Sequence, residues 1–112
     1  MPEELGAEDE KIVILARSAR ARTGAAEGAA VRDTDGRTYS ATNVELPSFQ
    51  LTALQAAIAA AVSSGAEGLE AAVLVSAEPA FPEQSVHAVR DLAPDAPIFR
   101  ADPSGSVQEV LR

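Results

Sequence analysis

The spacing of hydrophobic positions changes several times along the chain, and each change indicates a new structural element. The first apolar stretch repeats at steps of three and four residues, which predicts a helix over 7–22. Its expected buried face consists of Ile12, Leu15, Ala16 and Ala19. Acidic residues begin this stretch and arginines end it, in the order that the helix dipole favours.

Two β-prone runs, 28–32 and 37–42, flank the sequence Asp-Thr-Asp-Gly, which ends at Gly36. An Asp-Gly pair in this position predicts a hairpin, because glycine readily adopts the positive φ angle that the turn needs. The following segment, 43–50, contains a Pro-Ser pair, and we interpret it as a loop.

The alanine-rich stretch over 51–64 contains no glycine or proline and stops at Gly65, which predicts a second helix. Because this helix is apolar on nearly all sides, we expect it to be buried on most of them. The remaining pattern predicts a strand over 70–76, a helix over 83–92, a strand over 98–102, and either a strand or a short helix over 106–111.

The resulting element order, α-β-β-α-β-α-β-(β), indicates an α/β protein. Strands that alternate with helices predict a mostly parallel sheet, covered on both faces and beginning with one antiparallel hairpin. A length of 112 residues allows one domain, 1–112, in which we expect residues 1–6 to be disordered.

The composition excludes several kinds of chemistry. Hydrophobic residues make up 46% of the chain and aromatic residues 4%, so the core consists of small aliphatic side chains. The absence of cysteine excludes disulfides and thiolate metal sites, and the single histidine, His87, excludes a multi-histidine centre. A net charge of −8 argues against nucleic acid and membranes as partners. No apolar run approaches the length of a membrane span and the N-terminus lacks signal-peptide features, so we expect a cytoplasmic protein.

One segment, from Gly36 to Thr52, resembles the cytidine deaminase family. In that family a hairpin ends in Asn-Val-Glu-Asn, and a small residue, a tyrosine and a Leu-Thr-x-Cys-Ala-Glu-Arg helix start follow. Six residues match this pattern without a gap, namely Asn43, Val44, Glu45, Ser48, Leu51 and Thr52, while Phe49 replaces the tyrosine. The element order also fits, from about residue 10 to about residue 110. The resemblance implies a three-layer α/β/α fold with a mixed central sheet of about five strands.

The family's zinc ligands and catalytic glutamate are missing from this sequence. Zinc is held there at the start of the second helix and by a Cys-x-x-Cys pair at the start of the third, and it activates a water with the help of a glutamate. The register places Leu54 on the first ligand and Ala56 on the glutamate, while Glu83 and Val86 fall on the two cysteines. The resemblance therefore implies a degenerate member with no catalytic residues, no metal and no cofactor.

A rebuilt metal site is an alternative. Glu83 and His87 lie four residues apart on one predicted helix face, and Asp102 or Glu78 would have to supply a third ligand. The interpretation that we favour makes His87 an ordinary helix residue, paired with Glu83 or Asp91.

Asn43 and Glu45 occupy the positions that bind the ribose hydroxyls of a nucleoside in the family. An asparagine offers a donor and an acceptor, and a glutamate accepts from a hydroxyl group, so the resemblance implies a nucleoside pocket at these two residues. The alternative is that both residues brace the turn into the second helix without any ligand.

The function expected from these observations is that of a non-catalytic cytidine deaminase-like protein. We expect a homo-oligomer, a dimer or tetramer, that acts in binding or as a scaffold, with at most a vestigial nucleoside pocket and with a nucleoside or a protein as partner. The alternative is a divergent nucleoside- or nucleotide-processing hydrolase, related to cytidine deaminase, in which Glu45, Glu83 and His87 supply the acid and base groups of a non-zinc or rebuilt site.

Overall fold

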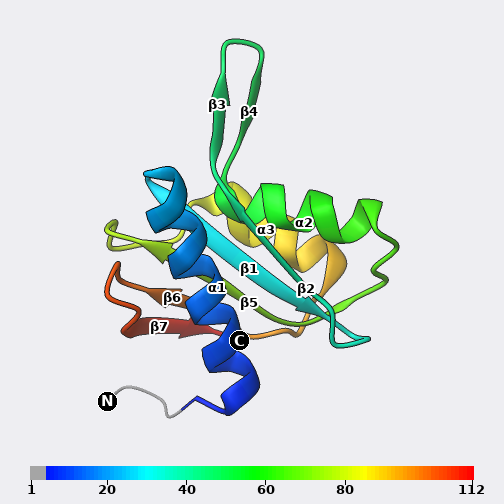
Figure 1. The fold of residues 1–112 in the computed structure, drawn as a ribbon. Coiled ribbons are helices and arrows are strands. Elements are labelled where there is room, and N and C mark those ends of the chain that lie inside the picture. The colour runs from blue at the N-terminus through cyan, green and yellow to red at the C-terminus, as the bar shows by residue number, and fades with distance from the viewer. Residues whose placement is uncertain (1–4) are drawn as a thin grey trace.

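The computed structural model describes residues 5–112, which contain three helices and seven strands. The helices are α1 (Ala7–Thr23), α2 (Ala53–Ser63) and α3 (Glu83–Leu92). The strands are β1 (Glu27–Asp33), β2 (Thr38–Thr42), β3 (Val44–Leu46), β4 (Phe49–Leu51), β5 (Leu69–Ser76), β6 (Ile98–Ala101) and β7 (Val107–Leu111). Five strands form the central sheet in the order β2-β1-β5-β6-β7, while β3 and β4 form a separate two-stranded ribbon (Figure 1).

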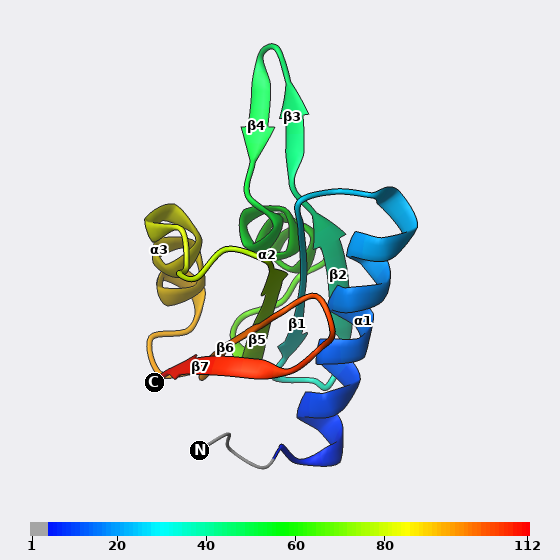
Figure 2. The same cartoon turned by 90° about the vertical axis from the view of Figure 1, so that its left-hand side faces the viewer.

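The helices cover both faces of the central sheet. Figure 2 shows α1 on one side of the sheet and both α2 and α3 on the other. Each side has its own apolar cluster: one joins α2 and α3 to the sheet, and the other joins α1 to the opposite face. The expected three-layer α/β/α fold with a mixed five-stranded sheet is therefore confirmed.

Small residues allow α1 to lie very close to β1. A Cβ atom on Gly28 would collide with the backbone oxygen of Ala16 and would lie 2.9 Å from the Cβ of Arg20. Only glycine fits this position without displacing the helix, because it has no side chain. The absence of a side chain at Gly28 therefore allows close packing between the helix and the sheet.

The prediction of a mostly parallel sheet is wrong. Among neighbouring strands of the central sheet, only β5 and β6 run parallel, and every other pair is antiparallel. The chain leaves β2, passes through the ribbon and α2, and returns as β5, which pairs with β1 instead of β2. Because β1 is antiparallel to both, β2 and β5 run in the same direction without being neighbours.

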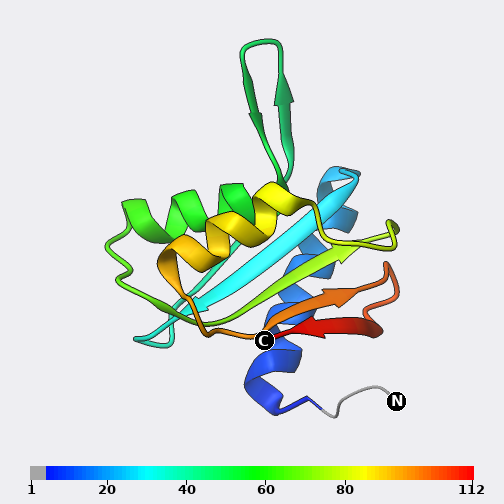
Figure 3. The same ribbon diagram turned by 180° about the vertical axis from the view of Figure 1, so that it is seen from behind.

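The predicted loop at 43–50 is instead the β3–β4 ribbon, which rises away from the body of the domain (Figure 3). Leu46 pairs with Phe49 across its turn, so the Pro-Ser pair sits in a tight hairpin. Because Leu51 belongs to this ribbon and Thr52 is the N-cap, the helix begins at Ala53 and not at 51.

The expectation that the second helix is buried on most sides is also wrong. Its buried residues form one face, consisting of Ala53, Leu54, Ala57 and Ala61. Val62 on the outer side is 51% exposed. The helix lies in an outer layer of the fold, where the sheet and α3 cover it and its remaining side is exposed.

Other elements agree with the sequence pattern. The hairpin between β1 and β2 turns at Gly36, whose φ is 85°. The segment over 106–111 is a strand, β7. Of the residues that we expected to be disordered, Leu5 packs against the α1 cluster, and residues 1–4 lie outside the described residues. No helix in the described part of the chain is long and apolar enough to cross a membrane.

Asp33 closes the β1–β2 hairpin. Its Oδ1 accepts hydrogen bonds from the backbone N–H groups of Asp35 and Arg37, both at 2.9 Å. The Tyr39 hydroxyl donates to its Oδ2 at 2.9 Å. Burial acts to raise the pKa of Asp33, but the donors from Arg37, Tyr39 and Asp35 outweigh burial and leave that pKa below its usual value.

Asp33→Asn is expected to lower the melting temperature at neutral pH, because an amide nitrogen does not accept the Tyr39 hydroxyl proton. Folding lowers the pKa of Asp33. Its contribution to the stability of the fold is therefore complete above the unfolded pKa of about 4, and it is lost as the pH falls through the lower pKa of the folded state. The melting temperatures of wild type and Asp33→Asn should therefore become equal in acid. Thermal unfolding across a pH series measures this difference.

Asp35→Asn is the matched control, because it removes the same charge from the same turn and its carboxylate has no hydrogen bond to the residues that the structure describes. Equal melting temperatures of wild type and Asp33→Asn at neutral pH would contradict the stabilising role of Asp33.

Candidate functional site

A cleft of about 820 Å³ opens at one edge of the central sheet. It lies where β1 begins, where β2 and β5 end, and where the N-termini of α2 and α3 meet. The base of the β3–β4 ribbon forms one side of its mouth. Ligands of open α/β sheets commonly bind at such strand ends, so this cleft is the candidate site.

The first turn of α2 forms the floor of the cleft. Thr52 and Gln55 make a capping box: the Thr52 hydroxyl accepts from the Gln55 N–H at 3.1 Å, and the Gln55 side chain accepts from the Thr52 N–H at 2.9 Å. The carboxylate of Glu27 accepts from the Ala53 N–H at 3.0 Å. These bonds satisfy backbone donors that have no partner inside the helix.

A hydroxyl pair joins the starts of the two helices. Ser85 on α3 is fully buried, and its Oγ donates to the Oγ1 of Thr52 at 2.7 Å. Thr52 thus connects the capping box of α2 to the first turn of α3. A buried hydroxyl needs such a partner, since an unpaired one is costly.

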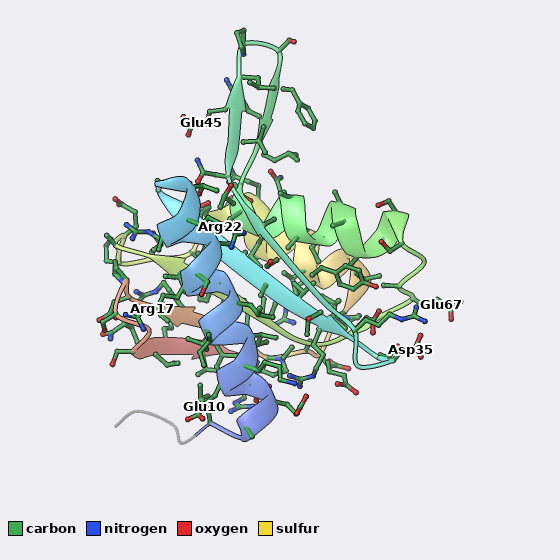
Figure 4. The ribbon with its side chains drawn as sticks, in the orientation of Figure 1. Glu10, Arg17, Arg22, Asp35, Glu45 and Glu67 are labelled. Atoms are coloured by element: carbon green, nitrogen blue, oxygen red, sulfur yellow. The ribbon has the colours of Figure 1, made fainter. Side chains whose placement is uncertain are left out.

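Asn43 and Glu45, the residues expected to bind a nucleoside, both line the cleft. The Oδ1 atom of Asn43 accepts from the backbone N–H of Glu27 at 3.0 Å, and its Nδ2 lies 3.4 Å from Oε2 of Glu45. Glu45 projects from β3 on the ribbon (Figure 4). The Asn43 side chain therefore braces the start of β1, and it still presents its amide nitrogen beside the Glu45 carboxylate.

The positions that the resemblance assigns to zinc are arranged differently. Leu54 is fully buried in the apolar cluster between α2, α3 and the sheet, and Val86 packs against the same cluster. Ala56 is half-buried, and Glu83 is exposed. Among these four side chains only Glu83 carries a metal-binding atom, so the set does not fit zinc, which takes three or four protein ligands.

The alternative metal site is not assembled either. Glu83 and His87 are exposed on α3, and within residues 5–112 no three His, Cys, Asp or Glu side chains form a group that could hold a metal ion. Asp102 closes its own turn, where it accepts hydrogen bonds from Ser104. The bond from the Ser104 hydroxyl lowers the pKa of Asp102, and the Ser106 N–H adds to this effect.

Several residues line the cleft that the sequence did not assign to a nucleoside pocket. Arg20 of α1 and Glu78 after β5 line it, together with glutamines 50, 55 and 84. Glu27 was missed because its partner Ala53 lies 26 positions away, and no spacing rule connects the two. One arginine and three glutamates line the cleft, so its formal charge is negative.

Comparison with known proteins agrees with this architecture. Crystal structures of cytidine deaminases are similar to the chain: the enzyme from Burkholderia pseudomallei has a TM-score of 0.79 at 21% identity, covering 90% of this chain and 89% of that one. The enzyme from Mycobacterium leprae gives 0.69 at 23% identity, with 92% and 93% covered. The enzyme from Mycobacterium tuberculosis gives 0.70 at 23% identity, with 93% and 91% covered. At these identities the likeness concerns the fold.

No curated protein sequence matches the chain. The family described as cytidine deaminase-like matches residues 5–105, which is nearly the whole chain. The resemblance first indicated by residues 43–52 is thereby confirmed, and the chain belongs to the cytidine deaminase-like family.

Proposed function

We propose that this chain is a non-catalytic member of its family, which assembles with copies of itself and keeps at most a vestigial nucleoside pocket. The observation that carries the proposal is the packing where α2 and α3 begin. Leu54 and Val86 belong to an apolar cluster there, and Ala56 stands at the position of the proton-transferring glutamate. None of these three side chains binds a metal or moves a proton.

The alternative of a divergent hydrolase needs acid and base groups at one place. Glu45 lines the cleft, whereas Glu83 and His87 are exposed on α3 and do not line it. This separation favours the non-catalytic proposal.

The first test concerns metal and activity. Purified protein is expected to carry no stoichiometric zinc by elemental analysis, to release no uridine from cytidine, and to keep its melting temperature in a chelator. One equivalent of zinc, together with a melting temperature that falls in the chelator, would overturn the non-catalytic proposal.

A matched pair of variants tests the apolar packing in the same experiment. Leu54→Ala is expected to destabilise the protein by about 2–5 kcal/mol in denaturant unfolding, since it opens a cavity in the core. Ile14→Ala on the exposed side of α1 is the control and should stay within about 0.5 kcal/mol of wild type. Similar stability of the two variants would contradict the placement of Leu54.

The pocket part of the proposal is supported by the chemistry of Asn43 and Glu45. The Asn43 amide nitrogen offers a donor and the Glu45 carboxylate offers an acceptor. Two neighbouring hydroxyl groups, as on a ribose, match such a pair, because one accepts while the other donates. The negative charge of the lining favours an uncharged ligand over an anionic one.

Cytidine and uridine are expected to raise the melting temperature of the wild type in a thermal-shift titration. Glu45→Ala should weaken binding about tenfold or more, because it removes a charged acceptor. Glu83→Ala removes the same charge from a residue outside the cleft and should bind as wild type does. A flat titration with every nucleoside would mean that the pocket is closed and that the fold serves assembly or a protein partner.

Self-assembly is supported by apolar surface that the chain leaves uncovered. Leu46 and Phe49 at the end of the ribbon are each 54% exposed. A lone two-stranded hairpin is only marginally stable in water, so a ribbon of this kind gains from a partner surface. The helix α2 carries no charged side chain, which favours close packing of another copy against its outer face.

Wild-type protein is expected to be a dimer or tetramer by size-exclusion chromatography with light scattering at micromolar concentration. Phe49→Ser should shift it toward monomer, because the substitution removes apolar contact area from the ribbon. Ile14→Ser is the control, since Ile14 is exposed to a similar extent, 60%, on α1. A monomeric wild type across the concentration series would contradict self-assembly.

A further inference from the structure

Glu27 contacts two walls of the cleft at once. It begins β1, and its Oε1 atom accepts from the backbone N–H of Ala53, at 3.0 Å. Its own backbone N–H donates to Oδ1 of Asn43, also at 3.0 Å. One residue of the central sheet is therefore bonded to the start of α2 and to the residue that follows β2.

The bond to Asn43 decides which end of that side chain faces a ligand. A backbone N–H is a donor, so the atom of Asn43 that faces Glu27 must be the amide oxygen. The amide nitrogen then points toward Glu45, at 3.4 Å, which is long for a hydrogen bond. Asn43 is thus held as a donor with spare capacity beside the Glu45 carboxylate.

The bond to Ala53 fixes the opposite wall. Ala53 is the first residue of α2, and its N–H has no partner inside the helix. A carboxylate at this end is also favoured by the helix dipole. Because the adjacent Thr52 is bonded to Ser85 of α3, the contact extends from β1 through α2 to the third helix.

We propose that Glu27 is a positioning residue of the cleft, which holds Asn43 on one wall and the start of α2 on the other at a fixed separation. The inference rests on the nucleoside pocket proposed above. A preformed pair of walls lowers the ordering cost of binding, so loosening them weakens affinity even where no ligand contact is removed.

Two substitutions at Glu27 test its side-chain bond to Ala53, and both keep the backbone N–H that donates to Asn43. Glu27→Ala removes the acceptor for Ala53, and we expect cytidine or uridine to bind about tenfold more weakly by calorimetry. Glu27→Gln keeps an amide oxygen as acceptor and should bind within about threefold of wild type. Asp33→Ala is the control: it removes a hydrogen-bonded carboxylate from the other end of β1 and should leave affinity unchanged well below its melting temperature.

A second readout needs no ligand. By NMR, Glu27→Ala should speed hydrogen exchange of the Ala53 amide and shift the side-chain amide signals of Asn43, whereas Asp33→Ala should change neither. The positioning role would be overturned if Glu27→Ala bound cytidine or uridine as tightly as the wild type does. Unchanged side-chain amide signals of Asn43 would overturn it as well. If the wild type binds no nucleoside while the NMR changes occur as expected, the nucleoside pocket fails and the structural link through Glu27 stands.

Discussion

The backbone N–H groups at the start of α2 have no partners inside the helix, and the walls of the cleft are arranged around the groups that satisfy them. The side chains of Thr52 and Gln55 do so in the capping box, and the side chain of Glu27 does so from β1. Thr52 in turn receives the hydroxyl of Ser85 from α3. Side chains therefore join the two helix starts to the central sheet. In the family, the zinc ligands lie at these two helix starts.

The fold also depends on small residues at the contacts between helices and sheet. Gly28 lets α1 lie against β1, and alanines on α2 let it lie against the other face of the sheet. Leu54 near the start of α2 and Val86 of α3 belong to the same packing. A family architecture can therefore persist while the residues at its site change, since packing outside the cleft also holds the layers together.

Most elements could be predicted because their signals are local. The Asp-Gly turn at Gly36, the helical spacing of α1 and the match at Asn43 and Glu45 all lie within short stretches. Strand pairing could not be predicted, since β5 joins β1 across the ribbon and α2. The ribbon itself was missed because a Pro-Ser pair is typical of loops and of tight hairpins alike. The cleft residue Glu27 depends on tertiary contacts, which leave no periodic pattern in the sequence.

The place of Tyr39 beside Asp33 also determines which part of the domain a near-ultraviolet signal reports. The chain has one tyrosine and no tryptophan, so its near-ultraviolet absorption comes mainly from the Tyr39 ring. That ring is tied to the last residue of β1, whereas the cleft lies at the first. The Tyr39 ring therefore reports melting of the β1–β2 hairpin and lies far from the cleft. An optical signal from the cleft requires an added dye or an introduced aromatic residue.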